Sequence, residues 1–164
     1  MAQDNFTLTT FYENWKTYQD HIRSALAPLT AEQLALRPAP HLRSVGENAA
    51  HIIGCRIGWF TQTMHEDGGA HAQLFASWSD KRADASGAEF VRGLDASWDL
   101  MAGCLARWSD DDMRQIFDDD WGNGNIVHLS RAWIVWHVME HDLHHGGELA
   151  FTLGMHGIPA EFPG

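Results

Sequence analysis

The sequence predicts an all-α fold in which four long helices form a bundle, and we expect a single domain over residues 1–164. Apolar residues recur three and four positions apart through most of the chain, which is the period of an amphipathic helix. No segment shows the sustained alternation of apolar and polar residues that indicates a half-buried strand. A hydrophobic fraction of 45% over this length suits one domain with a core of its own.

The first predicted helix covers residues 9–26 and ends before Pro28, because proline disfavours helix in the residue that precedes it. The segment LTAEQL then predicts a short helical turn capped by Thr30. In RPAP, Pro38 and Pro40 predict an extended connection. The apolar stripe of the first helix, which we expect to face the core, consists of Phe11, Trp15, Tyr18, Ile22 and Leu26.

Two further long helices are predicted to begin at capping boxes, in which a serine and the glutamate three residues later satisfy each other's backbone N–H groups. Ser44 in SVGE opens the second long helix, which we expect to end near residue 66. Ser86 in SGAE opens the third, which we expect to end near residue 107. Residues 66–86 form the longest predicted loop.

An acidic connection, WSDDDMRQIFDDDWGNGN, precedes the fourth predicted helix. Its aspartate runs lack the ligand spacing of an EF-hand calcium loop, so we expect them to lie on a solvated face. The fourth helix is predicted to begin near Ser130 and to end at Gly154, because glycine suits the left-handed residue that often closes a helix.

The composition excludes several classes of function. The 22 acidic residues outnumber 11 basic ones, and a formal charge of −11 opposes binding to a phosphate backbone, so no nucleic-acid partner is expected. No apolar run suits a membrane span and no signal peptide is evident, so we expect a cytoplasmic protein without a membrane partner. Cys55 and Cys104 match no disulfide framework or paired-cysteine metal motif, and we expect both to be reduced.

The segment WHVMEHDLHHGGEL holds four of the chain's 11 histidines. His137, His141 and His145 recur every four residues and share one helix face, whereas His144 points about 100° away from His145. The outer two members of the stripe lie roughly 12 Å apart along the helix axis, too far to bind one ion together. A metal ion would therefore take His141 with either His137 or His145.

The second long helix offers a further ligand. In NAAHIIGCRIGWF, His51 is the one histidine in a stretch of apolar and small residues that is typical of close helix packing. Such a histidine alone is more often a core residue whose neighbours satisfy its hydrogen bonds. A histidine pair on another helix favours a metal site instead, because helix bundles combine single residues and turn-spaced pairs in this way.

The segments SVGENAAHIIG and VWHVMEHDLHHGGEL resemble the two signature segments of the DinB-like family, and the resemblance spans nearly the whole chain, including LTAEQLALRPAP. The family is named for DNA-damage-inducible members. Its four-helix proteins are related to thiol-dependent S-transferases and mycothiol-dependent maleylpyruvate isomerases. The resemblance implies that the metal ligands are His51, His141 and His145. Many relatives carry Arg after the last of these, where this chain has Gly146, so no function that needs a basic group there is expected.

Three neutral imidazoles would leave an open position on a divalent ion. Zn²⁺ is the expected metal, and Ni²⁺ or Fe²⁺ suit the same ligands. A metal-bound water could attack a substrate, or the metal could bind a low-molecular-weight thiol, as the resemblance implies. We therefore expect a metal-dependent transferase or hydrolase that acts on a small molecule. The alternative is a non-catalytic metal-binding module of the stress response.

Four residues near the histidines have both a structural and a functional interpretation. Glu47 could orient His51, but its capping box already explains it. Glu148 and Asp142 are candidates for hydrogen bonds to the ligand imidazoles, although we expect Asp142 on an exposed charged face. Cys55 is expected as a small core residue rather than as a ligand or a reactive thiol.

The aromatic residues bear on assembly. Some of them could line a pocket above the metal, but we expect them in the core: Trp59, Phe60, Trp121, Trp133 and Trp136. The first and fourth helices carry apolar residues on more than one face, and a surplus apolar face commonly marks a partner surface. Because closed two-fold pairing is the commonest assembly, we expect a homodimer whose interface leaves the metal site open.

Overall fold

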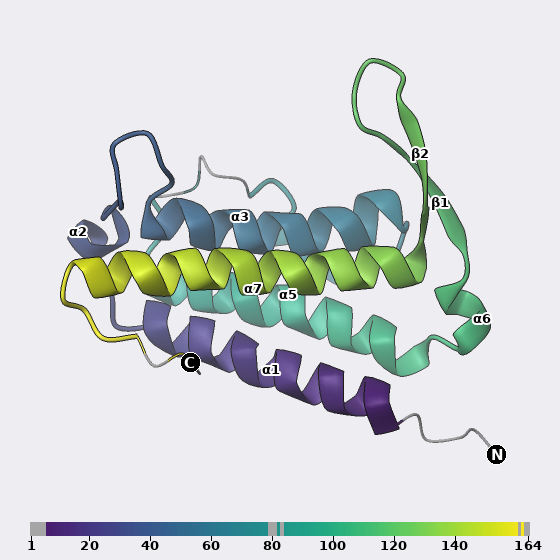
Figure 1. Ribbon diagram of the computed structural model, residues 1–164, viewed down its shortest axis with the longest axis horizontal. Coiled ribbons are helices and arrows are strands. Elements are labelled where there is room, and N and C mark those ends of the chain that lie inside the picture. Colours follow the sequence, from purple (N-terminus) through teal and green to yellow (C-terminus); the bar gives the residue numbers. More distant parts are fainter. Residues whose placement is uncertain (1–5, 79–81, 83, 161, 163–164) are drawn as a thin grey trace.

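Four long helices form the body of the molecule and lie side by side in the computed structural model (Figure 1). They are α1 (Phe6–Leu26), α3 (Val45–Gly58), α5 (Gly87–Arg107) and α7 (Arg131–Met155). The structure describes residues 6–78, 82, 84–160 and 162. Helix α3 packs against α5 and α7, and α1 packs against the same two helices. The mostly helical fold that the sequence predicts is confirmed.

Local capping determines where the helices begin. Ser44 accepts a hydrogen bond from the backbone N–H of Glu47 at the start of α3, and the Glu47 carboxylate accepts one from the N–H of Ser44. The same capping box opens α5 at Ser86, and Thr30 opens the short helix α2 (Ala31–Leu34). Ser130 caps α7. These four predicted starts are confirmed because each depends on residues within one helical turn.

Helices α1 and α5 end at Leu26 and Arg107, as predicted, whereas the ends of α3 and α7 differ from the prediction. Helix α3 passes into a π-helical turn, η1 (Trp59–Thr63), and the predicted loop beyond it contains a short helix, α4 (Gly69–Phe75). Helix α7 continues through Gly154, and the left-handed residue after it is Gly157, with φ of 70°. A glycine inside a helix and one beyond its end look alike in sequence, which explains the displaced end.

A β-hairpin occupies the predicted acidic connection, so the all-α expectation is wrong in this region. After the short helix α6 (Asp110–Met113), β1 (Ile116–Asp120) pairs antiparallel with β2 (Ile126–Ser130). The hairpin extends away from the long helices next to the start of α7 (Figure 1). Gly122, Asn123 and Gly124, in the turn between the strands, all have positive φ.

Composition conceals the hairpin in the sequence. Phe117 is the one buried residue of β1, and it pairs with Leu129 of β2, while exposed Ile116 and three aspartates make up the rest of β1. One buried residue is too short an alternation to indicate a strand. The segment WGNGN did carry a turn signal, because asparagine and glycine tolerate the positive φ of tight hairpin turns.

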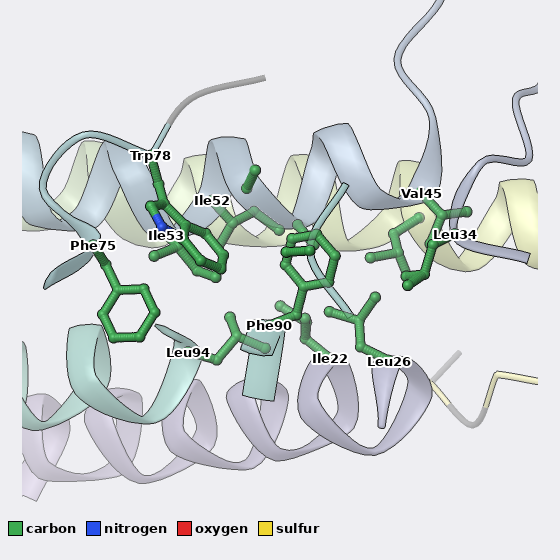
Figure 2. Close-up of a cluster of buried hydrophobic side chains, with 14 of the residues drawn as sticks. Ile22, Leu26, Leu34, Val45, Ile52, Ile53, Phe75, Trp78, Phe90 and Leu94 are labelled. Carbon is green, nitrogen blue, oxygen red and sulfur yellow. The ribbon is translucent and has the colours of Figure 1, made fainter. Parts of the chain in front are cut away.

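Two clusters of buried side chains fill the space between the long helices. In the first, Ile22 and Leu26 of α1 face Ile53 of α3, together with Phe90 and Leu94 of α5 (Figure 2). The second cluster surrounds Trp15 and includes Phe60, Met101, Phe117, Ile134 and Val138. Although the inner faces are apolar, no helix in the described part of the chain is long and apolar enough to cross a membrane.

Candidate metal centre

Three histidines meet between α3 and α7. His51 comes from α3, and His141 and His145 come from successive turns of α7. One ligand atom from each lies within 4.8 Å of the others. The Nε2 atoms of His51 and His141 are 3.0 Å apart, and the ring centre of His145 lies 4.7 Å from that of His51. The structure thus brings together the three residues that the family resemblance implies as ligands.

Burial favours the neutral form of the imidazoles of His141 and His145. It lowers the pKa of His141 to about 2, assisted by the neighbouring His145 and His51. Burial also lowers the pKa of His145, although Glu148 opposes that shift. Neutral imidazole is the form that binds a metal ion, so the two histidines of α7 have the protonation state that a divalent ion requires.

Glu148 is hydrogen-bonded to the Nδ1 side of the His145 ring. Its Oε2 lies 2.7 Å from Nδ1 of His145, which leaves the Nε2 of that ring as the nitrogen for a ligand bond. Carboxylates commonly orient metal-binding histidines in this way. The prediction that Glu148 contacts a candidate ligand is therefore confirmed. Exposed His144 also reaches Glu148, with 3.3 Å between its Nε2 and Oε1.

His137, the alternative ligand, lies outside this cluster. Its ring stacks on Trp133 with 5.1 Å between the ring centres, and it lies 6.1 Å from the ring of His141. It belongs to neither of the possible metal-binding groups found among the described residues. The geometry therefore favours His145 over His137 as the partner of His141.

The helix register explains how α7 comes so close to its neighbours. A Cβ built on Gly146 would lie 2.7 Å from the ring and hydroxyl of Tyr18 in α1, so any side chain there would displace the Tyr18 ring. The Tyr18 hydroxyl donates to the carbonyl of Leu143 in α7. Gly146 directly follows His145, so this contact between α1 and α7 lies next to the histidine cluster.

Comparison with known protein families matches residues 1–160 to the DinB family. The chain belongs to the DinB family. Among solved structures, it is similar to a DinB-like protein from Bacillus cereus ATCC 10987, with 17% sequence identity and a TM-score of 0.71. The match covers 94% of this chain and 95% of that chain, and at this identity it concerns the fold alone. No curated protein matches the chain.

A buried ion pair fixes the register of the DinB chain next to the histidines. Arg56 of α3 and Asp142 of α7 are both completely buried, and Nε of Arg56 lies 3.0 and 2.9 Å from the two Asp142 oxygens. Trp15 also donates to Asp142. The expectation of an exposed Asp142 is therefore wrong: the aspartate finds its partners on α1 and α3, which helical periodicity within α7 does not reveal.

Two other candidates have structural roles in this DinB protein. Glu47 completes its capping box and accepts two hydrogen bonds from Arg37, each 2.5 Å long. Cys55 is half-buried and lines a small cavity beside Trp59. Burial, followed by the nearby charge of Asp142, raises the pKa of its thiol to about 12. The Cys55 thiol is therefore a weak nucleophile at neutral pH, and the Glu47 carboxylate is already hydrogen-bonded to the cap and to Arg37.

The aromatic residues divide between core and surface. Phe60 is fully buried, as expected. Trp133 lies at the centre of a cluster, with the rings of Trp59, Trp121 and Trp136 at 6.3, 6.3 and 6.1 Å. Trp121 and Trp136 are exposed, contrary to expectation. The hairpin brings Trp121 close to Trp133 of α7. Because the sequence did not predict the hairpin, it could not predict this contact.

Proposed function

We propose that the chain is a metal-dependent enzyme in which His51, His141 and His145 hold a divalent transition metal. The observation that carries the proposal is the convergence of three imidazoles from two helices, with one ligand atom of each within 4.8 Å of the others. Zn²⁺ is the expected ion, and Ni²⁺ or Fe²⁺ suit the same nitrogen ligands.

When bound, such an ion would supply an open position that lowers the pKa of a water or a thiol. The chain's own residues hold and orient the site. Glu148 accepts a hydrogen bond from Nδ1–H of His145, which keeps the proton on Nδ1 and leaves the lone pair on Nε2 for a metal ion. Arg56 and Asp142 lock α3 to α7, which keeps His51 opposite the other two histidines.

The proposed reaction is a transfer or hydrolysis on a small molecule, with a low-molecular-weight thiol as a candidate co-substrate. The chain's own thiols are poor candidates for the nucleophile. Burial raises the pKa of Cys55 to about 12, and it also raises the pKa of Cys104. A thiolate or hydroxide nucleophile would therefore come from the bound small molecule or from water.

The alternative proposal is a metal-binding module of the stress response without catalysis, in which the ion ties α3 to α7. The buried ion pair beside the histidines argues against a need for such a tie, because it already joins the same two helices. We further propose that residues 1–164 form one cytoplasmic domain whose four long helices make up a bundle.

We also propose a homodimer. Two exposed apolar side chains, Phe11 of α1 and Leu143 of α7, line one cavity between these helices. The histidines lie between α7 and α3 instead. Pairing through the α1–α7 face would leave them accessible.

Turnover in the presence of Zn²⁺ and a panel of small thiols tests the proposed enzyme. We expect transfer or hydrolysis that is lost in His141→Ala and retained in His137→Ala. Melting of the protein with and without metal tests the alternative. An ion that acts mainly as a tie gives a large rise in melting temperature without turnover by any member of the panel.

A further inference from the structure

A cavity of about 540 Å³ adjoins the histidine cluster. The connection between α2 and α3 covers one side of it, and the last turns of α7 form the other. Its size falls in the range of about 300–1,000 Å³ that is usual for small-molecule sites. Glu148 lines this cavity and contacts Nδ1 of His145, so a ligand there would lie next to the candidate metal centre. The lining residues are Pro38, His41, Leu42, Arg43, Asn48, Glu148, Phe151 and Thr152.

The lining includes groups of both charges. Arg43 contributes a guanidinium from the connection before α3, and Glu148 contributes a carboxylate from α7. The charge of Arg43 acts on both Glu148 and His145, which places it close to the histidine cluster. A ligand with only negative charge would face Glu148, and one with only positive charge would face Arg43. The pair favours a ligand that carries both charges.

A buried acceptor lies in the same wall. Asn48 is 3% exposed, and its Oδ1 has no hydrogen-bond partner among the described residues. Buried side-chain oxygens are normally paired, because an unpaired one costs about 1–3 kcal/mol. An N–H group of a ligand would satisfy it.

The rim of the cavity is apolar. Phe151 is 66% exposed and Leu42 is 46% exposed, and both line the cavity with Pro38. An aliphatic or aromatic group of a ligand would bury part of this surface.

We propose that the cavity binds a small zwitterion of the α-amino-acid class with an apolar side chain. Arg43 donates to its carboxylate, Glu148 and the Oδ1 of Asn48 accept from its ammonium group, and Phe151 packs on its side chain. The role of this zwitterion as a substrate rests on the proposed function, since a metal held by the three histidines would supply the reactive centre. The binding of the zwitterion to the cavity does not depend on that function.

Calorimetric titration of the full chain with leucine, leucinamide and N-acetylleucine tests the proposal. Leucine is expected to bind saturably. Leucinamide, which lacks the carboxylate, and N-acetylleucine, which lacks the ammonium charge, are each expected to bind at least about tenfold more weakly, as for the loss of a hydrogen bond to a charged group. No saturable binding of leucine, or equal affinity for all three, would overturn the proposal.

A matched pair of arginine variants locates the binding. Arg43→Gln is expected to lower the affinity for leucine by about tenfold and to leave the affinity for leucinamide unchanged, because leucinamide already lacks the carboxylate that Arg43 contacts. Arg114→Gln, at an exposed arginine that directly follows α6 and does not line the cavity, is expected to match the parent protein. Circular dichroism checks that both variants are folded. Unchanged leucine affinity in a folded Arg43→Gln protein would contradict the assignment.

Repeating the titrations on metal-free and Zn²⁺-loaded protein separates this site from the metal centre. Leucine binding by a protein that fails to bind Zn²⁺ would refute the proposed enzyme and support the zwitterion site. Zn²⁺ binding without leucine binding would refute the zwitterion site alone.

Discussion

Arg56 and Asp142 form a completely buried ion pair between α3 and α7, with Nε of the arginine within 3.0 Å of both carboxylate oxygens. Gln19 and Ser97 accept further hydrogen bonds from the guanidinium, so all four long helices contribute to one polar centre. Asp142 directly follows His141 in the chain. The pair therefore couples the stability of the fold to the position of the candidate metal centre.

Removing the arginine should destabilise the protein strongly. Arg56→Met leaves Asp142 buried without a counter-charge, and the expected loss in the free energy of unfolding is about 3–5 kcal/mol. Urea unfolding measures it. The control is Arg23→Met, which breaks the half-exposed pair with Asp95 and should cost about 0–1 kcal/mol. Equal losses in the two variants would show that the buried pair has no special role.

A side chain at Gly146 should destabilise the protein. A Cβ there would contact Tyr18 at 2.7 Å, so Gly146→Ala is expected to lower the free energy of unfolding by about 1–3 kcal/mol. Gly147→Ala is the matched control, since nothing lies within 4 Å of its Cβ. That change should be neutral or stabilising by up to about 1 kcal/mol, because alanine favours helix. Thermal or urea unfolding that gives the reverse order would contradict the close packing of α1 and α7.

The two thiols should react slowly in the folded protein. Burial raises the pKa of Cys55 to about 12, so at pH 8 nearly all of it is the unreactive thiol, and the reactive fraction grows as the pH rises towards that value. Alkylation with iodoacetamide, followed by mass spectrometry, should label Cys55 and Cys104 quickly only after unfolding. Labelling of the folded protein at the rate of free cysteine would show that Cys55 is a reactive group.

The proposed dimer should depend on the face between α1 and α7. Light scattering should give a mass of twice 18.4 kDa for the parent protein, and Leu143→Glu should reduce it to that of the single chain. Leu74→Glu changes a leucine on α4 that is more exposed than Leu143, at 68% against 47%, and should leave the dimer intact. A parent protein that stays at the mass of one chain at high concentration would refute the dimer.

Features that depend on neighbouring residues could be predicted from sequence. The helix starts at Ser44 and Ser86 follow from capping boxes, and the shared face of His141 and His145 follows from helical periodicity. His51 could be predicted as the third ligand only because a single histidine on another helix accompanies that pair and because the chain resembles the family.

Features that depend on distant residues could not. The burial of Asp142 depends on Arg56, which is 86 residues away in the sequence. The hairpin depends on pairing between β1 and β2, and its aspartates gave no periodic signal. The cavity beside Glu148 joins residues of the α2–α3 connection to α7, so helical periodicity could not place Asn48 in its wall.

Metal content tests the central claim most directly. The parent protein, His145→Ala and His137→Ala would each be equilibrated with Zn²⁺, freed of excess ion and measured by elemental analysis, with circular dichroism to verify folding. We expect a stoichiometric ion in the parent protein and in His137→Ala, and its loss in a folded His145→Ala protein. Metal retained by His145→Ala, or lost from His137→Ala, would contradict the assignment of His51, His141 and His145 as the ligands.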